Sequence, residues 1–151
     1  MKRFSKSILG VTLLEIMLVL AVAAIVIVMS VRYYQSASAS QQANSTLEEV
    51  QAITAAGDGI AQGTGTYVGV TPAAVTPMMP NNSLATPWGS TITITAPTPT
   101  GYTVSIPGTP QNVCAQLIAR LGGASPKYTT ITPATCPTGT STVSYVFDST
   151  K

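Results

Sequence analysis

The dominant pattern in the chain is one long apolar run near its N-terminus. Residues 11–31 are apolar except for Thr12, Glu15 and Ser30. A helix of about 21 residues, rising ~1.5 Å per residue, is about 31 Å long, which matches the hydrocarbon thickness of a bilayer. The run therefore predicts a helix that crosses a membrane.

Basic residues flank this run unevenly, with Lys2, Arg3 and Lys6 before it and Arg32 after it. Positive charge collects on the cytoplasmic side of membrane helices. We therefore expect a single pass through the membrane with the N-terminus in the cytoplasm. A secretory signal peptide is the competing interpretation, but its apolar stretch is usually only about 7–15 residues long.

Beyond the run, the sequence continues to favour a helix. Leu47, Val50 and Thr54 recur at the spacing of one helix face, and the glycines of 57–59 supply a stop. The pattern predicts a helix from about Thr12 to Ala56, with residues 32–59 as its amphipathic continuation. The Ser/Ala/Gln-rich composition of 36–44 favours a local loosening of this helix.

Residues 60–151 have the pattern of a globular domain. Alternating residues predict strands, and Thr109, Pro110 and the pair Gly122-Gly123 resemble the N-cap, first turn and end of a short helix. The expected elements are a connection over 60–88 with a short strand at 66–70, strands at 91–95, 102–106, 128–132 and 142–147, and a helix between the second and third of these four strands. The predicted fold class is α+β: a long N-terminal helix packed on an antiparallel sheet with a second short helix.

The composition of the chain excludes several kinds of catalytic and binding site. The chain has no histidine, only 8% charged residues and a formal net charge of +2. Histidine triads and typical catalytic zinc sites are therefore excluded. The few basic residues form no evident nucleic-acid site, and we expect no bound metal, no cofactor and no enzymatic activity.

Two cysteines fall in the part expected outside the membrane: Cys114 on the expected short helix and Cys136 between the last two expected strands. An oxidising compartment allows a disulfide between them, with a stabilisation of roughly 3 kcal/mol for a loop of this size. Two separate buried thiols are the alternative.

The N-terminal motif is the most specific signal in the chain. A carboxylate such as Glu15 within a bilayer costs about 3 kcal/mol and usually faces a partner. Its surroundings, Gly10-Val11-Thr12-Leu13-Leu14-Glu15-Ile16 after a short basic leader, resemble the type IV pilin and pseudopilin signature.

This resemblance implies a processed precursor. Prepilin peptidase would remove the leader, residues 1–10, by cutting between Gly10 and Val11, and the new Val11 amine would be methylated. The mature chain would comprise the filament-core helix at 11–31, its continuation, and the domain at 60–151. In a filament, Glu15 of one subunit would meet the Val11 ammonium of a neighbour, with Thr12 beside them in the assembly site, so that two costly charges cancel.

Residues in the domain resemble type IVb pilins in particular. They are Pro87-Trp88-Gly89, Ile106-Pro107, and Cys114 followed by Leu117-Ile118. The short leader is instead typical of type IVa pilins, and Val11 replaces the more usual Phe, Met or Leu, so the subclass stays open.

The resemblance implies a structural subunit of a type IV pilus. The subunit would wait in the inner membrane and then enter a helical homo-oligomeric filament at the cell surface, used for adhesion, aggregation, motility or DNA transfer. The implied partners are prepilin peptidase, an assembly ATPase and an inner-membrane platform protein.

Two other functions share parts of this pattern. A minor pilin or a type II secretion pseudopilin would have the same N-terminus, although Asp58 and Asp148 are too few for the calcium site that major pseudopilins carry. A membrane-anchored enzyme with a Ser125/Lys127 pair is the third candidate, and a solvated loop lysine is the simpler interpretation of Lys127.

Overall fold

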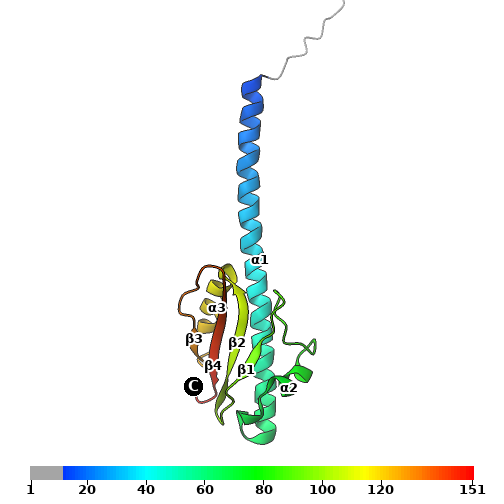
Figure 1. Cartoon of the computed structure of the whole chain (residues 1–151), viewed down its shortest axis with the longest axis vertical. Helices are drawn as coiled ribbons and strands as arrows, with labels where there is room; N and C mark the ends of the chain where they lie inside the picture. Colours follow the sequence, from blue (N-terminus) through cyan, green and yellow to red (C-terminus); the bar gives the residue numbers. More distant parts are fainter. Residues whose placement is uncertain (1–11) are drawn as a thin grey trace, which may run out of the picture. The chain divides into compact units, whose positions relative to one another are not determined.

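The computed structural model describes residues 12–151. The chain divides into two compact units, of which the first ends at Ala37 and the second comprises Ser38–Lys151. One helix, α1 (Leu13–Thr64), passes from the first into the second (Figure 1). The second unit adds a four-stranded antiparallel sheet and a further helix, which confirms the predicted α+β class.

The second half of α1 buries one regular stripe. Its buried residues are Ala39, Ala43, Thr46, Val50, Ile53, Ala56 and Gly57. They recur every three or four positions, which is the spacing of one helix face. Leu47 and Thr54, expected on the central line of this face with Val50, flank it and are only half-buried.

The expected loosening of α1 around residues 36–44 is wrong, because the helix is continuous there. Ala39 and Ala43 pack with Val113 in a small buried cluster. The guanidinium of Arg120 also donates a hydrogen bond to Ser40 Oγ over 3.2 Å. Small side chains at these positions allow close packing, so tertiary contacts outweigh the weak local preference.

The expected helix end at 57–59 is also wrong. A Cβ atom at Gly57 would lie 3.0 Å from the Tyr102 hydroxyl oxygen, so this glycine permits a close approach between helix and sheet. The helix ends instead at Thr64, followed by Gly65 in the left-handed region with φ of 77°. Glycine is favoured there because it has no Cβ to clash.

The sheet has the order β1-β2-β4-β3. Its strands are β1 (Thr93–Thr95), β2 (Gly101–Pro110), β3 (Tyr128–Thr132) and β4 (Thr140–Asp148), all paired antiparallel. The predicted antiparallel sheet is therefore confirmed, with β1 paired to β2 and β3 paired to β4. β1 is shorter than expected, and β2 and β4 are longer.

Alternate residues of the sheet point into one core. One face of the sheet carries the buried residues Tyr102, Val104 and Ile106 of β2 and Val143, Tyr145 and Phe147 of β4. They form a single apolar cluster with Val50 and Ile53 of α1. The predicted alternation thus marks the face that the helices cover.

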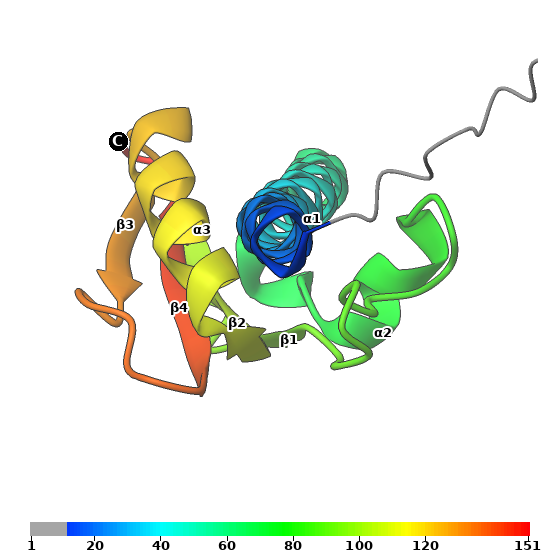
Figure 2. The ribbon, with the colours of Figure 1, turned by 90° about the horizontal axis from the view of Figure 1, so that it is seen from above.

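Helix α3 (Gln111–Ala124) packs against β2, β3 and β4 (Figure 2). Its start differs from the prediction, because Thr109 Oγ1 donates to the Ile106 carbonyl and does not cap the helix. Gly122 and Gly123 lie inside the helix and do not end it.

The connection between α1 and the sheet contains three short helical turns. They are η1 (Tyr67–Gly69), α2 (Pro72–Val75) and η2 (Thr76–Met78), so the strand expected at 66–70 is wrong. Further along, the Trp88 indole donates a hydrogen bond to the Pro107 carbonyl over 2.9 Å. The two proline-containing motifs at 87–89 and 106–107 are thereby joined.

Candidate functional site

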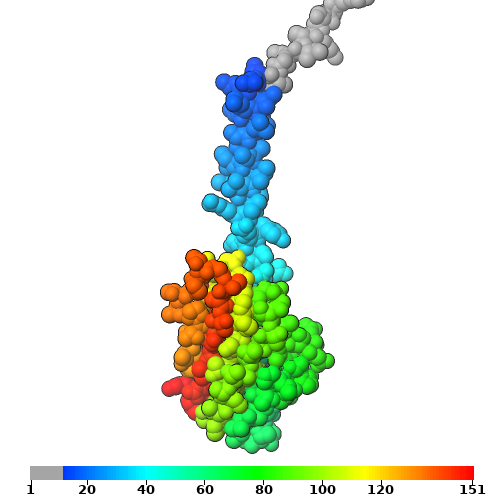
Figure 3. All heavy atoms as spheres, in the orientation of Figure 1, coloured from blue at the N-terminus to red at the C-terminus, as the bar shows by residue number. Residues whose placement is uncertain are grey.

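The described part of the first unit, residues 12–37, carries an apolar surface that no other described residue covers. Every residue from Thr12 to Ala37 is exposed. Ile25 is 57% exposed and Leu20 is 62% exposed. Figure 3 shows this segment in blue, with its side chains uncovered on the face drawn.

By length and composition, α1 is able to cross a membrane. The polar Ser30 does not interrupt this surface, because its hydroxyl donates to the Val26 carbonyl over 2.7 Å. A hydroxyl bonded one turn back along its own helix needs no partner in lipid. The segment is thus compatible with a single-pass membrane anchor.

Tyrosines follow the apolar run immediately. Tyr33 is 79% exposed and Tyr34 is 74% exposed, and both come directly after Arg32. Tyrosine and arginine are typical of the interface between membrane and water. Sequence reasoning had missed this pair, although the position of two tyrosines at the end of an apolar run is itself the signal.

At the other end of the run, Thr12 and Glu15 form the start of the helix. The Glu15 N–H donates to Thr12 Oγ1 over 3.3 Å and to the Thr12 carbonyl over 3.0 Å. Thr12 therefore acts as the N-cap, and Glu15 stands at the position that completes a capping box. The carboxylate is exposed, and its charge suits the positive end of the helix dipole.

The cleavage motif cannot be placed in the same way. Gly10 and Val11 lie outside the described residues, so the expected peptide cut and the methylated amine have no structural counterpart here. The capping arrangement was missed from sequence, although Thr-x-x-Glu is its usual signature. The backbone N–H of Glu15 thus takes part in the start of the helix, beside the charge pairing expected of its carboxylate.

In the second unit, Cys114 and Cys136 form a disulfide with a Cα–Cα distance of 6.0 Å. Cys114 is fully buried on α3, and Cys136 lies in the connection between β3 and β4. The bridge fastens that connection to the helix, as the sequence predicts. A shallow cavity of ≈ 340 Å³ lies beside it, with Ile118 and Cys136 in its walls.

The acidic residues Asp58 and Asp148, weighed for a calcium site, have separate partners. Tyr67 donates its hydroxyl to Asp58 over 2.7 Å, and Asp148 accepts from Thr150. Burial, followed by the contact with Asp58, raises the pKa of Tyr67 to about 12. Within residues 12–151, no group of three or more acidic, histidine or cysteine side chains is placed to hold a metal ion.

Ser125 and Lys127 are joined by a hydrogen bond from the Lys127 backbone and not from its amine. The Lys127 N–H donates to Ser125 Oγ over 3.2 Å, which is the geometry of a turn. The Lys127 ammonium lies 5.7 Å from the centre of the Phe147 ring, in a cation–π contact. This geometry brings the amine to an aromatic ring and not to the serine hydroxyl.

Comparison of the chain with protein-family models, with curated proteins and with solved structures finds no match. The functional argument therefore depends on the chain's own geometry and on the N-terminal motif.

Proposed function

We propose that this protein is the structural subunit of a type IV pilus-like filament, held in the inner membrane before assembly. The observation that carries the proposal is that the two halves of α1 differ in the exposure of their side chains. One half is apolar on all sides and uncovered, and the other buries a single stripe on a disulfide-closed domain.

A helix that is apolar all round needs apolar surroundings on every side. Lipid supplies them before assembly, and the same segments of other copies supply them in a filament. Burial of apolar surface contributes roughly 25 cal/mol per Å² relative to water. Lipid already supplies this term, so association within the bilayer is weakly driven, and an assembly ATPase acting through a platform protein would extract the subunits.

Glu15 has two roles in this proposal. Its position in the capping box starts the helix, and its charge would pair with the methylated Val11 ammonium of the adjacent copy. The pairing matters because each charge alone is costly in an apolar core. Prepilin peptidase would expose that amine by removing residues 1–10.

The test is mass spectrometry of filaments sheared from the cell surface. We expect this chain to be the abundant subunit and to begin at an N-methylated Val11. Trace amounts in otherwise normal filaments would favour a minor pilin, and retention in the membrane with a secretion defect on deletion would favour a pseudopilin. A subunit that keeps residues 1–10 would contradict the proposed processing.

A further inference from the structure

A cavity of ≈ 360 Å³ lies beside the second half of α1. It is bounded by α1 on one side and on the other by the chain between η2 and β1, and all its lining residues belong to Ser38–Lys151. Its volume is within the usual range of small-ligand sites, about 300–1,000 Å³. The lining contains two carboxylates, Glu48 and Glu49, and no lysine or arginine.

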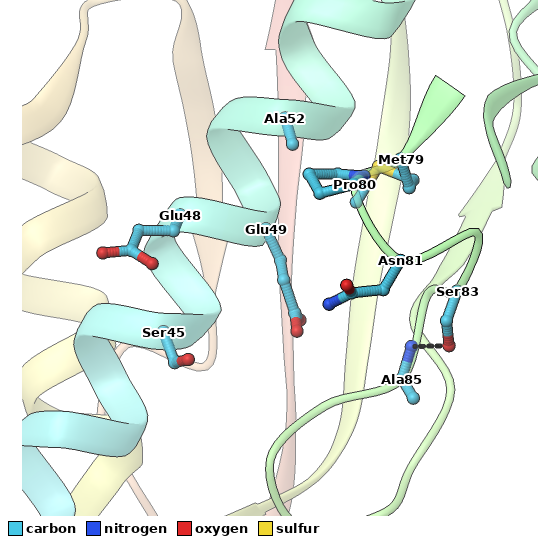
Figure 4. Close-up of a pocket in the computed structure, with 9 residues that line it drawn as sticks. All are labelled: Ser45, Glu48, Glu49, Ala52, Met79, Pro80, Asn81, Ser83 and Ala85. Atoms are coloured by element: carbon cyan, nitrogen blue, oxygen red, sulfur yellow. Dashed lines mark hydrogen bonds between the residues drawn. The ribbon is translucent and has the colours of Figure 1, made fainter. Parts of the chain in front are cut away.

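Glu49 is the unusual member of this lining. Its Oε2 atom is buried and has no hydrogen-bond partner among the described residues. Figure 4 shows the Glu49 and Asn81 side chains extending toward each other, whereas Glu48 points away. A buried acceptor without a donor loses its water without compensation.

A group that pairs with the Glu49 carboxylate would carry hydrogen-bond donors, and a positive charge would strengthen the pairing. Burial raises the pKa of Glu49 to about 7, which is the expected effect of removing water from an unpaired carboxylate. Glu48 is the other titratable side chain in the lining, and the segment facing α1 contributes Asn81, Ser83 and apolar residues. An occupant that carries N–H donors and a positive charge would compensate this carboxylate.

The unpaired oxygen of Glu49 suits a primary ammonium. An –NH₃⁺ group has three donors, and the lining offers Glu49 Oε2 as a buried acceptor, with the polar side chains of Asn81 and Ser83 elsewhere in the same lining. Ser83 Oγ already accepts the Ala85 N–H over 3.2 Å and keeps a second lone pair. Met79 and Pro80 supply apolar wall for the adjoining methylene groups.

We propose that this cavity binds a primary alkylammonium group, with Glu49 as its anionic partner. A divalent metal fits less well, because within residues 12–151 no set of three acidic, histidine or cysteine side chains is placed for one. The ammonium can come from a free amine or from a lysine side chain of a second copy. The inference does not depend on filament function.

Thermal unfolding of the full chain in an uncharged detergent, above the pKa of Glu49, tests the proposal. Butylammonium chloride is the probe, and tetramethylammonium chloride at equal concentration is the control because it has the charge without N–H donors. We expect butylammonium alone to raise the Tm with saturation, since a ligand that binds only the folded state stabilises it.

Two matched variants locate the effect. Glu49→Gln keeps the size of the side chain but removes its charge, and we expect it to weaken butylammonium binding at least about tenfold. Glu48→Gln removes the neighbouring charge that points away, and we expect its affinity to stay within about twofold of the native chain. Equal losses in both variants would overturn the assignment to Glu49.

A carbodiimide distinguishes the two sources, since it condenses a carboxylate with a nearby amine into an amide and leaves as a urea. A Glu49–lysine amide between copies, suppressed by butylammonium, would identify a second copy as the source. Saturable stabilisation without that cross-link would identify a free amine. No butylammonium effect and no Glu49 cross-link, or equal stabilisation by tetramethylammonium, would overturn the proposal.

Discussion

The two halves of α1 belong to one helix but meet different surroundings. In residues 13–37 the large apolar side chains are exposed, whereas in residues 38–64 the buried side chains form one stripe of mostly small residues. The second half packs this stripe on the domain of its own chain. In the proposed function, lipid and then other copies of the chain would surround the first half.

The largest expected effect in the first half is on filament assembly and comes from removing the charge of Glu15. Glu15→Gln keeps the capping box, because glutamine serves at that position as well as glutamate, but it cannot pair with an ammonium. We expect processed, inserted protein and a loss of nearly all surface filaments, measured by shearing and electron microscopy. Thr12→Ser is the control, since it keeps the cap and should assemble normally. Normal piliation in Glu15→Gln would reduce the role of Glu15 to starting the helix.

Two isoleucines provide a direct comparison of the halves. Ile53 is fully buried in the domain core, and Ile25 is 57% exposed in the first half. We expect Ile53→Ala to lower the free energy of unfolding of the domain by about 2–5 kcal/mol, and Ile25→Ala to change it by less than about 0.5 kcal/mol. Denaturant unfolding of the full chain in detergent measures both. Similar losses would mean that the first half also packs on its own chain.

The disulfide should stabilise the domain alone. Replacing Cys114 and Cys136 together by serine should lower the free energy of unfolding by roughly 3 kcal/mol, because the unfolded chain regains the entropy of the closed loop. Circular dichroism during thermal unfolding should show a lower Tm for the domain, while membrane insertion of the first half stays intact. Two free thiols in native protein, detected by alkylation, would contradict the bridge.

The smallest expected effect is a pH dependence of the stability of the second unit, caused by Glu49. Its pKa in the folded chain, about 7, lies above the ordinary value of 4.5 that holds in the unfolded chain. The folded state therefore holds its proton more tightly, and stability is greatest below about pH 4.5 and declines as pH rises to about 7. Because the side chain is partly exposed, we expect a change of only about 1 kcal/mol.

Glu49→Gln should flatten that decline, and Glu48→Gln should leave it in place. Unfolding midpoints measured across this pH range, without added amine, make the comparison. An unchanged pH profile in Glu49→Gln would show that its carboxylate is not the group that titrates.

Most of the fold could be predicted from local sequence patterns. The apolar run identified α1, alternation identified the strands, and the position of Cys136 between two predicted strands placed the disulfide against α3. Gly57 shows where local reasoning fails, since it reads as a helix stop but serves as the contact point for Tyr102, a residue 45 positions away.

Of the two candidate sites, the one at Glu15 could be predicted from the sequence and the one at Glu49 could not. Glu15 stands out because a charge interrupts an apolar run, which sequence displays directly. Glu49 does not stand out, because an acid on an amphipathic helix is ordinary until a distant loop covers it. The chain that contributes Asn81 and Ser83 has no periodic pattern, so its position over α1 depends on the whole domain and not on its own residues.

We propose that residues 12–31 obtain their partner in the filament from other copies of this chain. Electron cryomicroscopy of sheared filaments would show these segments directly. We expect these segments at the filament axis, packed against one another with water excluded and the domains outside. A filament in which residues 12–31 face solvent, or a surface filament that lacks this chain, would contradict the claim.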